Sequence, residues 1–338
     1  MALIRTATRT VDKQKQSLYK QMLTMPRFDI TIAGEINLDL ILYGVPEELP
    51  RERELLADRM MLTLGGSSAI LAHNLASLGS RVGFQSRIGD DEFGEIALQP
   101  LRQRGVDVSQ VRRTSGDVKA GAAKTGITVI LQRERWRNMV TYAGTIAELV
   151  WDDLDFGYLT NSRHFHLSSF YLQSGLRAWV PELFRKIKDA GLTVSLDTND
   201  DPDDAWEGGL DEALRHVDIF MPNEREAQKA AGVNDLETAV QRLSAIVPLV
   251  VVKMGSAGAM AQRGGERFVS PARKVESVDA VGAGDSFDAG FLHEYLRGGD
   301  LPACLAAGNL AGAFSTTRPG GIEAFRDDSY RNRFFAER

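Results

Sequence analysis

The sequence has a single cysteine, no long hydrophobic run and no excess of basic residues. Cys304 cannot form a disulfide within the chain and leaves no Cys-rich zinc site, which favours a reduced, cytoplasmic compartment. No stretch reaches the ~18 consecutive apolar residues of a membrane-spanning helix, so we expect no membrane as a partner. Lys and Arg number 40 against 46 Asp and Glu, whereas nucleic-acid binders usually carry a basic excess. We therefore expect no nucleic acid as a partner either.

The composition is otherwise that of an ordinary globular protein. Of the 338 residues, 43% are hydrophobic and 25% are charged, which is enough apolar material for a sizeable core. Residues 1–26 are basic and lack the apolar segment of a secretion signal, so we expect an N-terminal extension there. Residues 27–338 are expected to form one α/β domain.

Short apolar segments alternate with amphipathic ones along most of the chain. This alternation predicts a mainly parallel central sheet with helices on both faces. The segment Val247–Met254 is almost wholly apolar, as a strand buried on both faces should be. The other expected strands are Phe28–Ala33, Val82–Ile88, Phe165–Leu167, Leu192–Leu196 and Val217–Phe220, and the expected helices are Ser67–Leu78, Asp91–Arg104, Ala178–Ala190, Gly284–Leu296 and Leu301–Thr317.

Two further β segments interrupt this alternation. Thr125–Leu131 and Asn138–Tyr142 flank a charged turn at Arg133–Arg137, and they predict a small β lid contributed by about residues 36–64 and 118–146. Exposed strand edges tend to be paired or covered. A homodimer formed through the lid is therefore a further prediction.

The segment Asp279–Phe291, DAVGAGDSFDAGF, carries the most chemistry. Gly282, Ala283 and Gly284 form a turn of small residues, and we expect a helix to begin at Asp285. Backbone N–H groups that converge at a helix N-terminus favour an anion, such as a transferring phosphoryl group. A carboxylate beside that anion suits a general base. Helix capping by Asp and turn formation by Gly would explain the same residues, so spacing alone leaves both interpretations open.

This segment resembles the D-x-x-G-A-G-D signature of the ribokinase-like (PfkB) family of sugar kinases. Other segments resemble further elements of that family in the same order, over about residues 28–325. They are GGSSAILAHNLASLG at Gly65–Gly79, IGDDEFGE at Ile88–Glu95, MPNEREA at Met221–Ala227 and VVVKMGSAGA at Val250–Ala259. The resemblance implies a ribokinase-like α/β fold and transfer of the ATP γ-phosphate to a sugar hydroxyl.

The resemblance also implies roles on the nucleotide side, with ATP and Mg²⁺ required and K⁺ as a further candidate. Asp285 matches the catalytic base, and Gly282, Ala283 and Gly284 match the anion hole. Asn223 and Glu226 match the pair that organises Mg²⁺ and the ATP phosphates, with Glu226 acting through water. Lys253, Gly255 and Gly258 match positions that surround the nucleotide, and Asn309 matches a position near the adenine. Asp279 matches an acid that helps to bind a monovalent cation.

On the sugar side, the resemblance implies that Asn37 and Asp39 hold substrate hydroxyls. Gly65 and Gly66 let the backbone approach the sugar, and Arg137 matches an arginine on a lid strand.

Two positions depart from the family pattern. Ile70 stands where the family often has asparagine, and Asn74 lies one helical turn further on the same face, so we expect Asn74 to compensate. Asp201 stands where 2-keto-3-deoxygluconate kinases often have arginine, which argues against an acidic sugar.

Two other clusters predict no metal site. The aspartates between Asp197 and Asp204 begin like a calcium loop but lack its glycine and its final glutamate, so we expect a solvated connection with only Asp197 near the site. His164 and His166 alternate on a strand, which predicts a partly buried pair on one face rather than metal ligands.

The sequence therefore predicts an ATP- and Mg²⁺-dependent sugar kinase of the ribokinase or fructokinase type. A nucleoside kinase on the same fold is one alternative. A sugar- or nucleotide-binding regulator without turnover is another, and the intact residues Asp285, Gly282 and Gly284 count against it.

Overall fold

The computed structural model describes residues 26–114, 123–133 and 136–336. Most of the predicted extension, residues 1–25, lies outside the described residues, as do residues 115–122 and 134–135 of the predicted lid and its approach. Among the described residues, no helix is both long enough and apolar enough to cross a membrane.

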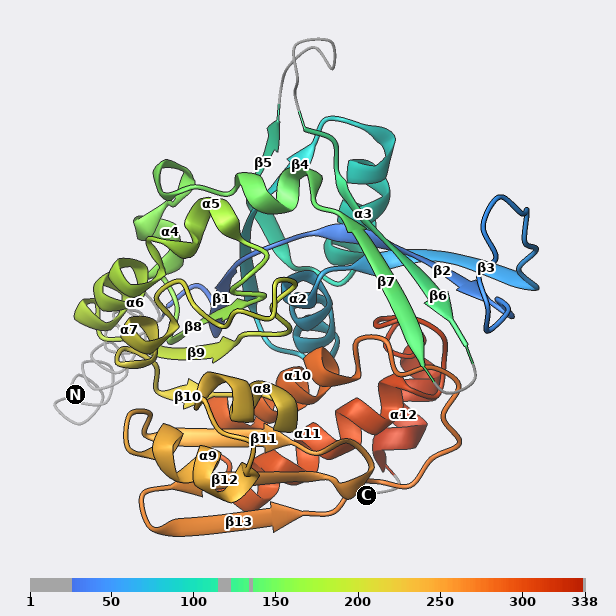
Figure 1. The fold of residues 1–338 in the computed structure, drawn as a ribbon. Helices are drawn as coiled ribbons and strands as arrows, with labels where there is room; N and C mark the ends of the chain where they lie inside the picture. Colours follow the sequence, from blue (N-terminus) through green and yellow to red (C-terminus); the bar gives the residue numbers. More distant parts are fainter. Residues whose placement is uncertain (1–25, 115–122, 134–135, 337–338) are drawn as a thin grey trace, which may run out of the picture.

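A nine-stranded sheet forms the centre of the molecule, in the order β13-β12-β11-β10-β9-β8-β1-β4-β5 (Figure 1). Neighbouring strands are parallel from β11 to β5, and β12 and β13 extend the sheet as an antiparallel hairpin. The predicted fold class is confirmed. The strands are β1 (Ile30–Ala33), β4 (Val82–Gly89), β5 (Asp107–Thr114), β8 (His164–Ser168), β9 (Thr193–Asp197), β10 (Ile219–Phe220), β11 (Leu249–Lys253), β12 (Ala259–Arg263) and β13 (Glu266–Ser270).

Helices cover both faces of this sheet, as predicted. One hydrophobic cluster joins the sheet to α2, α3, α10 and α11, and a second joins its other face to the helices from α4 to α9. These helices are α2 (Ser67–Ser77), α3 (Glu92–Gln103), α4 (Phe156–Leu159), α5 (Ser174–Arg177), α6 (Val180–Asp189), α7 (Leu210–Leu214), α8 (Glu224–Ala230), α9 (Leu236–Ser244), α10 (Ala283–Leu296) and α11 (Leu301–Ser315), followed by α12 (Asp328–Ala336).

A second sheet, in the order β3-β2-β6-β7, projects from the first (Figure 1). Its strands are β2 (Asn37–Tyr43), β3 (Arg59–Gly65), β6 (Gly126–Gln132) and β7 (Arg137–Tyr142). We call it the lid sheet. The four strands coincide with the two ranges from which we predicted a lid, except that β3 ends at Gly65, one residue beyond the first range.

The two faces of the lid sheet differ in polarity, because side chains alternate between faces along each strand. One row of paired residues carries Asp39, Thr63, Thr128 and Thr141, and we call that side the inner face. The opposite side, the outer face, is apolar. Its members include Leu40, Leu42, Met60, Leu62, Val129, Leu131, Val140 and Tyr142.

The strand order also determines where a ligand can bind. The chain moves from β1 to β4 and β5 on one side, and later from β8 to β11 on the other side. In parallel sheets, ligands bind beyond the carboxyl ends of the strands at such a switch point. Glu35, Ser169, Asp197, Asn223 and Lys253 lie at or just after carboxyl ends of these strands.

His164 and His166 are completely buried on β8, rather than partly buried as predicted. The Nε2 atom of His164 lies 2.7 Å from Ser195 Oγ, which lies 2.6 Å from Nδ1 of His166. Thr193 and Ser168 continue the chain of contacts at either end. Every ring nitrogen in this pair therefore has a polar partner, which explains how the core accommodates two imidazoles.

Candidate active site

The small-residue turn leads into α10, which begins at Ala283 and not at Asp285 as predicted. Gly282 caps the helix with a positive φ of 70°, and a Cβ there would lie 2.5 Å from the Gly321 Cα. Glycine is therefore required at this position. The first N–H groups of a helix have no acceptors within the helix, so the amides of Gly284 and Asp285 are available to an anion.

Asp285 is the third residue of α10, so the alternative interpretation of its side chain as the helix cap is wrong. Its carboxylate is buried and accepts a hydrogen bond from the Ser67 hydroxyl at the start of α2. Burial raises the pKa of Asp285 to about 6, with the negative charge of Asp197 adding to the increase. This carboxylate is therefore poised to exchange a proton near neutral pH.

The predicted sugar-binding residues come together on the inner face of the lid sheet. The Asn37 amide donates to Asp39 Oδ1 at 3.2 Å and to Thr128 Oγ1 at 3.4 Å. A Cβ on Gly65 would overlap Asp39, and a Cβ on Gly66 would lie 2.7 Å from Asn37 Oδ1. The two glycines therefore make room for these side chains.

The charge of Asp285 acts on the carboxyl of Asp39. Burial raises the pKa of Asp39 to about 7, and the charge of Asp285 contributes to the increase, while Arg137 opposes it. Arg137 shares the inner face with Asp39 because it lies four residues before Thr141, which is in the same row as Asp39 through Thr128 of β6. The structure thus places Arg137 on the side of the lid sheet that faces the carboxylates.

Ile70 and Asn74, which lie on one face of α2, make different contacts. Ile70 packs against Gly282 and Gly321. The Asn74 amide donates to Ser286 Oγ at 2.9 Å and to the Gly321 carbonyl at 3.0 Å, and its oxygen meets His73. These bonds indicate that Asn74 holds α2 against α10, and its expected contact with the sugar stays a prediction.

Asn223 and Glu226 form a reciprocal cap at the start of α8. The Asn223 side chain accepts from the Glu226 amide, and the Glu226 carboxylate accepts from the Asn223 backbone at 2.7 Å. Burial and the charge of Asp197 raise the pKa of Glu226 to about 7. Asn223 also pairs with Lys253 as an isolated bridge, so the predicted nucleotide residues of α8 and β11 are neighbours.

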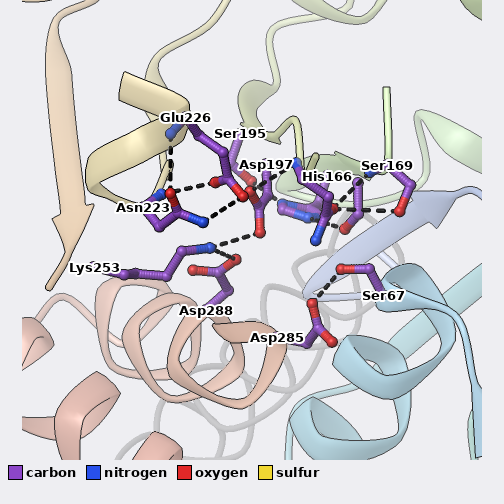
Figure 2. A network of polar contacts seen from close by, with 12 residues as sticks. Ser67, His166, Ser169, Ser195, Asp197, Asn223, Glu226, Lys253, Asp285 and Asp288 are labelled. Carbon is purple, nitrogen blue, oxygen red and sulfur yellow. Dashed lines mark hydrogen bonds and ion pairs between the residues drawn. The ribbon is translucent and has the colours of Figure 1, made fainter. Parts of the chain in front are cut away.

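Lys253 lies at the centre of a polar network at the end of β11 (Figure 2). Its Nζ is 2.6 Å from Asp197 Oδ2 and 3.1 Å from Asp288 Oδ2. Burial acts to lower the pKa of Lys253, and the charges of Asp197 and Asp288 outweigh it and raise that pKa. Asp288 was missed from the sequence, although it lies three residues after Asp285 and hence on the same helix face.

Gly258 and Asn309 meet at one loop on the far side of the hairpin. Gly258 has a φ of 98°, and a Cβ there would overlap the Ser270 carbonyl. The Asn309 amide donates to the same carbonyl at 3.0 Å and to the Pro271 carbonyl at 3.2 Å. Gly255 has a positive φ of 54° and begins a single helical turn. The structure brings Gly258 and Asn309 together around residues 270–272.

Asp279, expected near a monovalent cation, connects three segments. Its Oδ2 accepts from the Tyr43 hydroxyl at 2.7 Å and from the Gly320 amide at 3.1 Å, and its Oδ1 accepts from the Val281 amide at 2.8 Å. Asp279 therefore joins the lid sheet to the turn that leads into α10.

Two further acids organise the edge of the site. Glu35, which the sequence reading missed, is buried and accepts from the Ser68 hydroxyl at 2.7 Å and from the Ser169 hydroxyl at 2.8 Å. Its position just after the first strand was the available signal. Asp201 accepts the backbone amides of Asp203 and Trp206, so it stabilises its own loop.

The polar inner face of the lid sheet, the turn at residues 282–284 and the buried side chains of Asp285 and Lys253 thus belong to one site, and this combination is typical of a phosphotransferase. The sequence profile described as pfkB family carbohydrate kinase matches residues 27–328. The chain belongs to this family, and it is an ATP-dependent sugar kinase that phosphorylates a sugar hydroxyl, as predicted.

Individual relatives agree with this membership. The chain is 31% identical over 291 residues to a fructokinase from Klebsiella pneumoniae, covering 81% of this chain and 93% of that protein. It is 30% identical over 298 residues to an ATP-dependent ribose-1-phosphate kinase from Halopiger xanaduensis, covering 86% and 93%. A ribokinase-like protein from E. coli, solved in complex with ATP and Mg²⁺, has the same fold, with a TM-score of 0.79, 24% identity and coverage of 92% of this chain and 100% of that chain.

Proposed function

We propose that Asp285 is the general base of this sugar kinase and that Gly282, Ala283 and Gly284 form its anion hole. The observation that carries the proposal is the position of the Asp285 carboxylate, which is buried in the first turn of α10 beside available backbone amides. Its raised pKa suits a group that accepts a proton near neutral pH.

The proposed step is an in-line displacement. The acceptor hydroxyl of the sugar transfers its proton to Asp285 while its oxygen forms a bond to the γ-phosphorus of ATP. The bond between that phosphorus and the bridging oxygen breaks, and ADP leaves with the electron pair. Asp285 then returns the proton to solvent. Because such a reaction depends mainly on positioning and electrostatic stabilisation, the anion turn and the base have to be fixed before the substrates arrive.

Glu226 provides oxygen donors that fit Mg²⁺, which is a hard cation that keeps several of its waters. The carboxylate is largely buried, and its raised pKa indicates that its negative charge lacks full compensation where it stands. When bound, Mg²⁺ neutralises charge on the ATP phosphates. The E. coli structure that contains ATP and Mg²⁺ supports both ligands for this fold. We propose that Glu226 binds the ion through water, with Asn223 fixing its rotamer.

We propose a neutral sugar of the ribose or fructose kind as the acceptor. Asn37 and Asp39 offer the amide and carboxylate groups that hold hydroxyls, and Asp201 brings no positive charge to the site. The fructokinase among the relatives supports a ketose, whereas the ribose-1-phosphate kinase makes a phosphorylated pentose the main competitor.

The experiment is a coupled assay of ADP release over pentoses, hexoses, ketoses, sugar phosphates, sugar acids and nucleosides. We expect turnover with at least one neutral sugar and a lower kcat/KM for nucleosides. Preferred turnover of adenosine would instead establish the nucleoside kinase. Sugar-dependent ATP binding without turnover of any compound would establish the regulator.

Three finer proposals concern the surroundings of the site. The apolar outer face of the lid sheet, where Met60 and Val140 are more than half exposed, supports a homodimer formed through the lid. Asp279 and the carbonyls near Val281 and Gly320 are the proposed K⁺ site, which turnover in KCl against NaCl tests. The single buried cysteine supports a reduced, cytoplasmic location.

A further inference from the structure

The buried lysine Lys253 lies between two carboxylates of the site. The side chain of Lys253 is only 12% exposed, and those of Asp197 and Asp288 are each 1% exposed. Asp197 comes from the end of β9 and Asp288 from the second turn of α10. The ammonium is therefore held between the sheet and the helix that carries the anion turn (Figure 2).

The ammonium also lies beside the anion turn itself. A Cβ placed on Gly284 would be 3.7 Å from Lys253 Nζ. A phosphoryl group seated on the amides of Gly284 and Asp285 would therefore come within reach of this charge. Without Lys253, the acids Asp197, Asp285 and Asp288 would surround that position with negative charge only, and an anion would be repelled.

We infer that Lys253 contacts the transferring phosphoryl group and that Asp288 and Asp197 are positioning residues that aim it. This inference rests on the proposed function, and it adds a specific role to a lysine that family resemblance places only near the nucleotide. Lys253 keeps its proton throughout. It forms and breaks no covalent bond, and its charge stabilises the oxygens of the γ-phosphoryl group as negative charge develops on them.

Asp288 contributes through the geometry of its two oxygens. Its Oδ2 accepts from Lys253 Nζ at 3.1 Å, whereas Oδ1 is buried and has no hydrogen-bond partner in the part of the chain that the structure describes. Burial and the nearby charge of Asp197 raise the pKa of Asp288, whereas for Asp197 burial is outweighed by the charge of Lys253 together with hydrogen bonds, which lower its pKa. An asparagine at 288 keeps an oxygen that can accept from Lys253, whereas an alanine has none.

The first experiment removes the lysine charge without leaving an excess buried charge. The double variant Lys253→Met/Asp197→Asn is compared with Asp197→Asn alone, since removing Lys253 by itself would leave unpaired carboxylates and could prevent folding. We expect the double variant to have a melting temperature close to that of its control, and its kcat to be lower than that of the control by roughly 10²–10³-fold. We also expect it to lose roughly tenfold more affinity for ATP than for ADP, measured by calorimetry without sugar, because only ATP carries the γ-phosphate.

Equal losses of ATP and ADP affinity together with a kcat within threefold of the control would overturn the role of Lys253. The binding arm needs no sugar, so it remains interpretable if the sugar panel fails. In that case the proposed function is wrong while the contact with the γ-phosphate is still tested.

The second experiment separates positioning from folding at Asp288. We expect Asp288→Ala to lower kcat roughly 30-fold with less than a threefold change in the KM for sugar, and we expect Asp288→Asn to recover most of that loss. Glu294→Gln, a half-buried acid later on α10, serves as the matched control. Equal effects of the alanine and asparagine variants on kcat, or losses that follow melting temperature alone, would contradict a positioning role.

Discussion

The Asp39 carboxylate on β2 reaches over Gly65 on β3, the residue that pairs with Asn37, and a Cβ on Gly65 would overlap that carboxylate. Gly65→Ala should therefore displace Asp39 and Asn37 and leave the nucleotide side intact. We expect the KM for sugar to increase about tenfold or more, the value of one lost charged hydrogen bond, with the KM for ATP unchanged. Gly265→Ala, on a turn where a Cβ meets nothing within 4 Å, is the control. Equal changes in both KM values would argue against this local effect.

The role of Asp285 is tested by Asp285→Asn, which keeps the shape and removes the base. We expect kcat to fall by roughly 10²–10⁴-fold, while the affinity for ATP is retained because the anion turn is unchanged. Asp203→Asn, an exposed acid on a nearby loop, is the control. Near-native turnover of Asp285→Asn would rule out this carboxylate as the base.

The pKa of Asp285 predicts the pH dependence. Burial raises that pKa to about 6, with contributions from the charges of Asp197 and Glu35 and opposition from Ser67 and Lys253. Because the base works only when ionised, we expect kcat/KM to fall about tenfold per pH unit below about pH 6.

Ser67→Ala tests the cause of this limb. The Ser67 hydroxyl stabilises the ionised form of Asp285 and so lowers its pKa. Its loss should move the acidic limb to higher pH. The control is Ser77→Ala on the same helix, whose hydroxyl donates to the His73 carbonyl. If the acidic limb of the kcat/KM profile does not move in Ser67→Ala, a group other than Asp285 causes that limb.

The outer face of the lid sheet predicts the oligomeric state. Val140 on β7 is 65% exposed on this apolar face, and a buried lysine at that position in a dimer would be strongly unfavourable. We expect the unmodified chain to be a dimer by light scattering at micromolar concentration and Val140→Lys to be a monomer. Val269→Lys, at a similarly exposed valine on β13, should remain a dimer. If the unmodified chain is a monomer, the proposed homodimer is wrong.

The buried histidines predict acid sensitivity. Burial lowers the pKa of His164 and of His166 to about 3, whereas unfolded histidine titrates near ~6.5. Between these values the unfolded chain binds more protons, so stability falls as pH falls, by up to about 1.4 kcal/mol per pH unit for each histidine. Urea unfolding at several pH values measures this slope. His164→Gln should reduce it and His216→Gln should not; the same slope in all three proteins would refute the assignment.

The sequence predicted the parallel part of the central sheet except β5, and the helices on both of its faces, because alternating apolar segments are a local pattern. The hairpin of β12 and β13 was not predicted, and the roles of the site residues stay predictions. The start of α10 was misplaced by two residues because the cap is the left-handed Gly282, a conformation that spacing does not reveal.

What the sequence could not predict depends on contacts between distant segments. Asp288 on α10 belongs to the polar network only because the fold brings Lys253 of β11 and Asp197 of β9 next to it. The contact of Asn74 with the sugar stays a prediction, and nothing in the sequence indicated that its amide donates to Ser286 and Gly321. Side-chain direction within a packed interface is decided by neighbours that lie far away in the chain.

The hydrogen bond from Tyr43 to Asp279 has a thermodynamic consequence. One carboxylate holds a lid strand, the approach to the anion turn and the Gly320 loop at once. If the turn at residues 282–284 binds phosphate as proposed, a sugar that orders the lid sheet also orders that turn, so the entropy of ordering is shared between the two substrates. Binding linkage is reciprocal: by whatever factor the sugar tightens ATP, ATP tightens the sugar. Loss of the hydrogen bond between Tyr43 and Asp279 should make the two substrates bind independently.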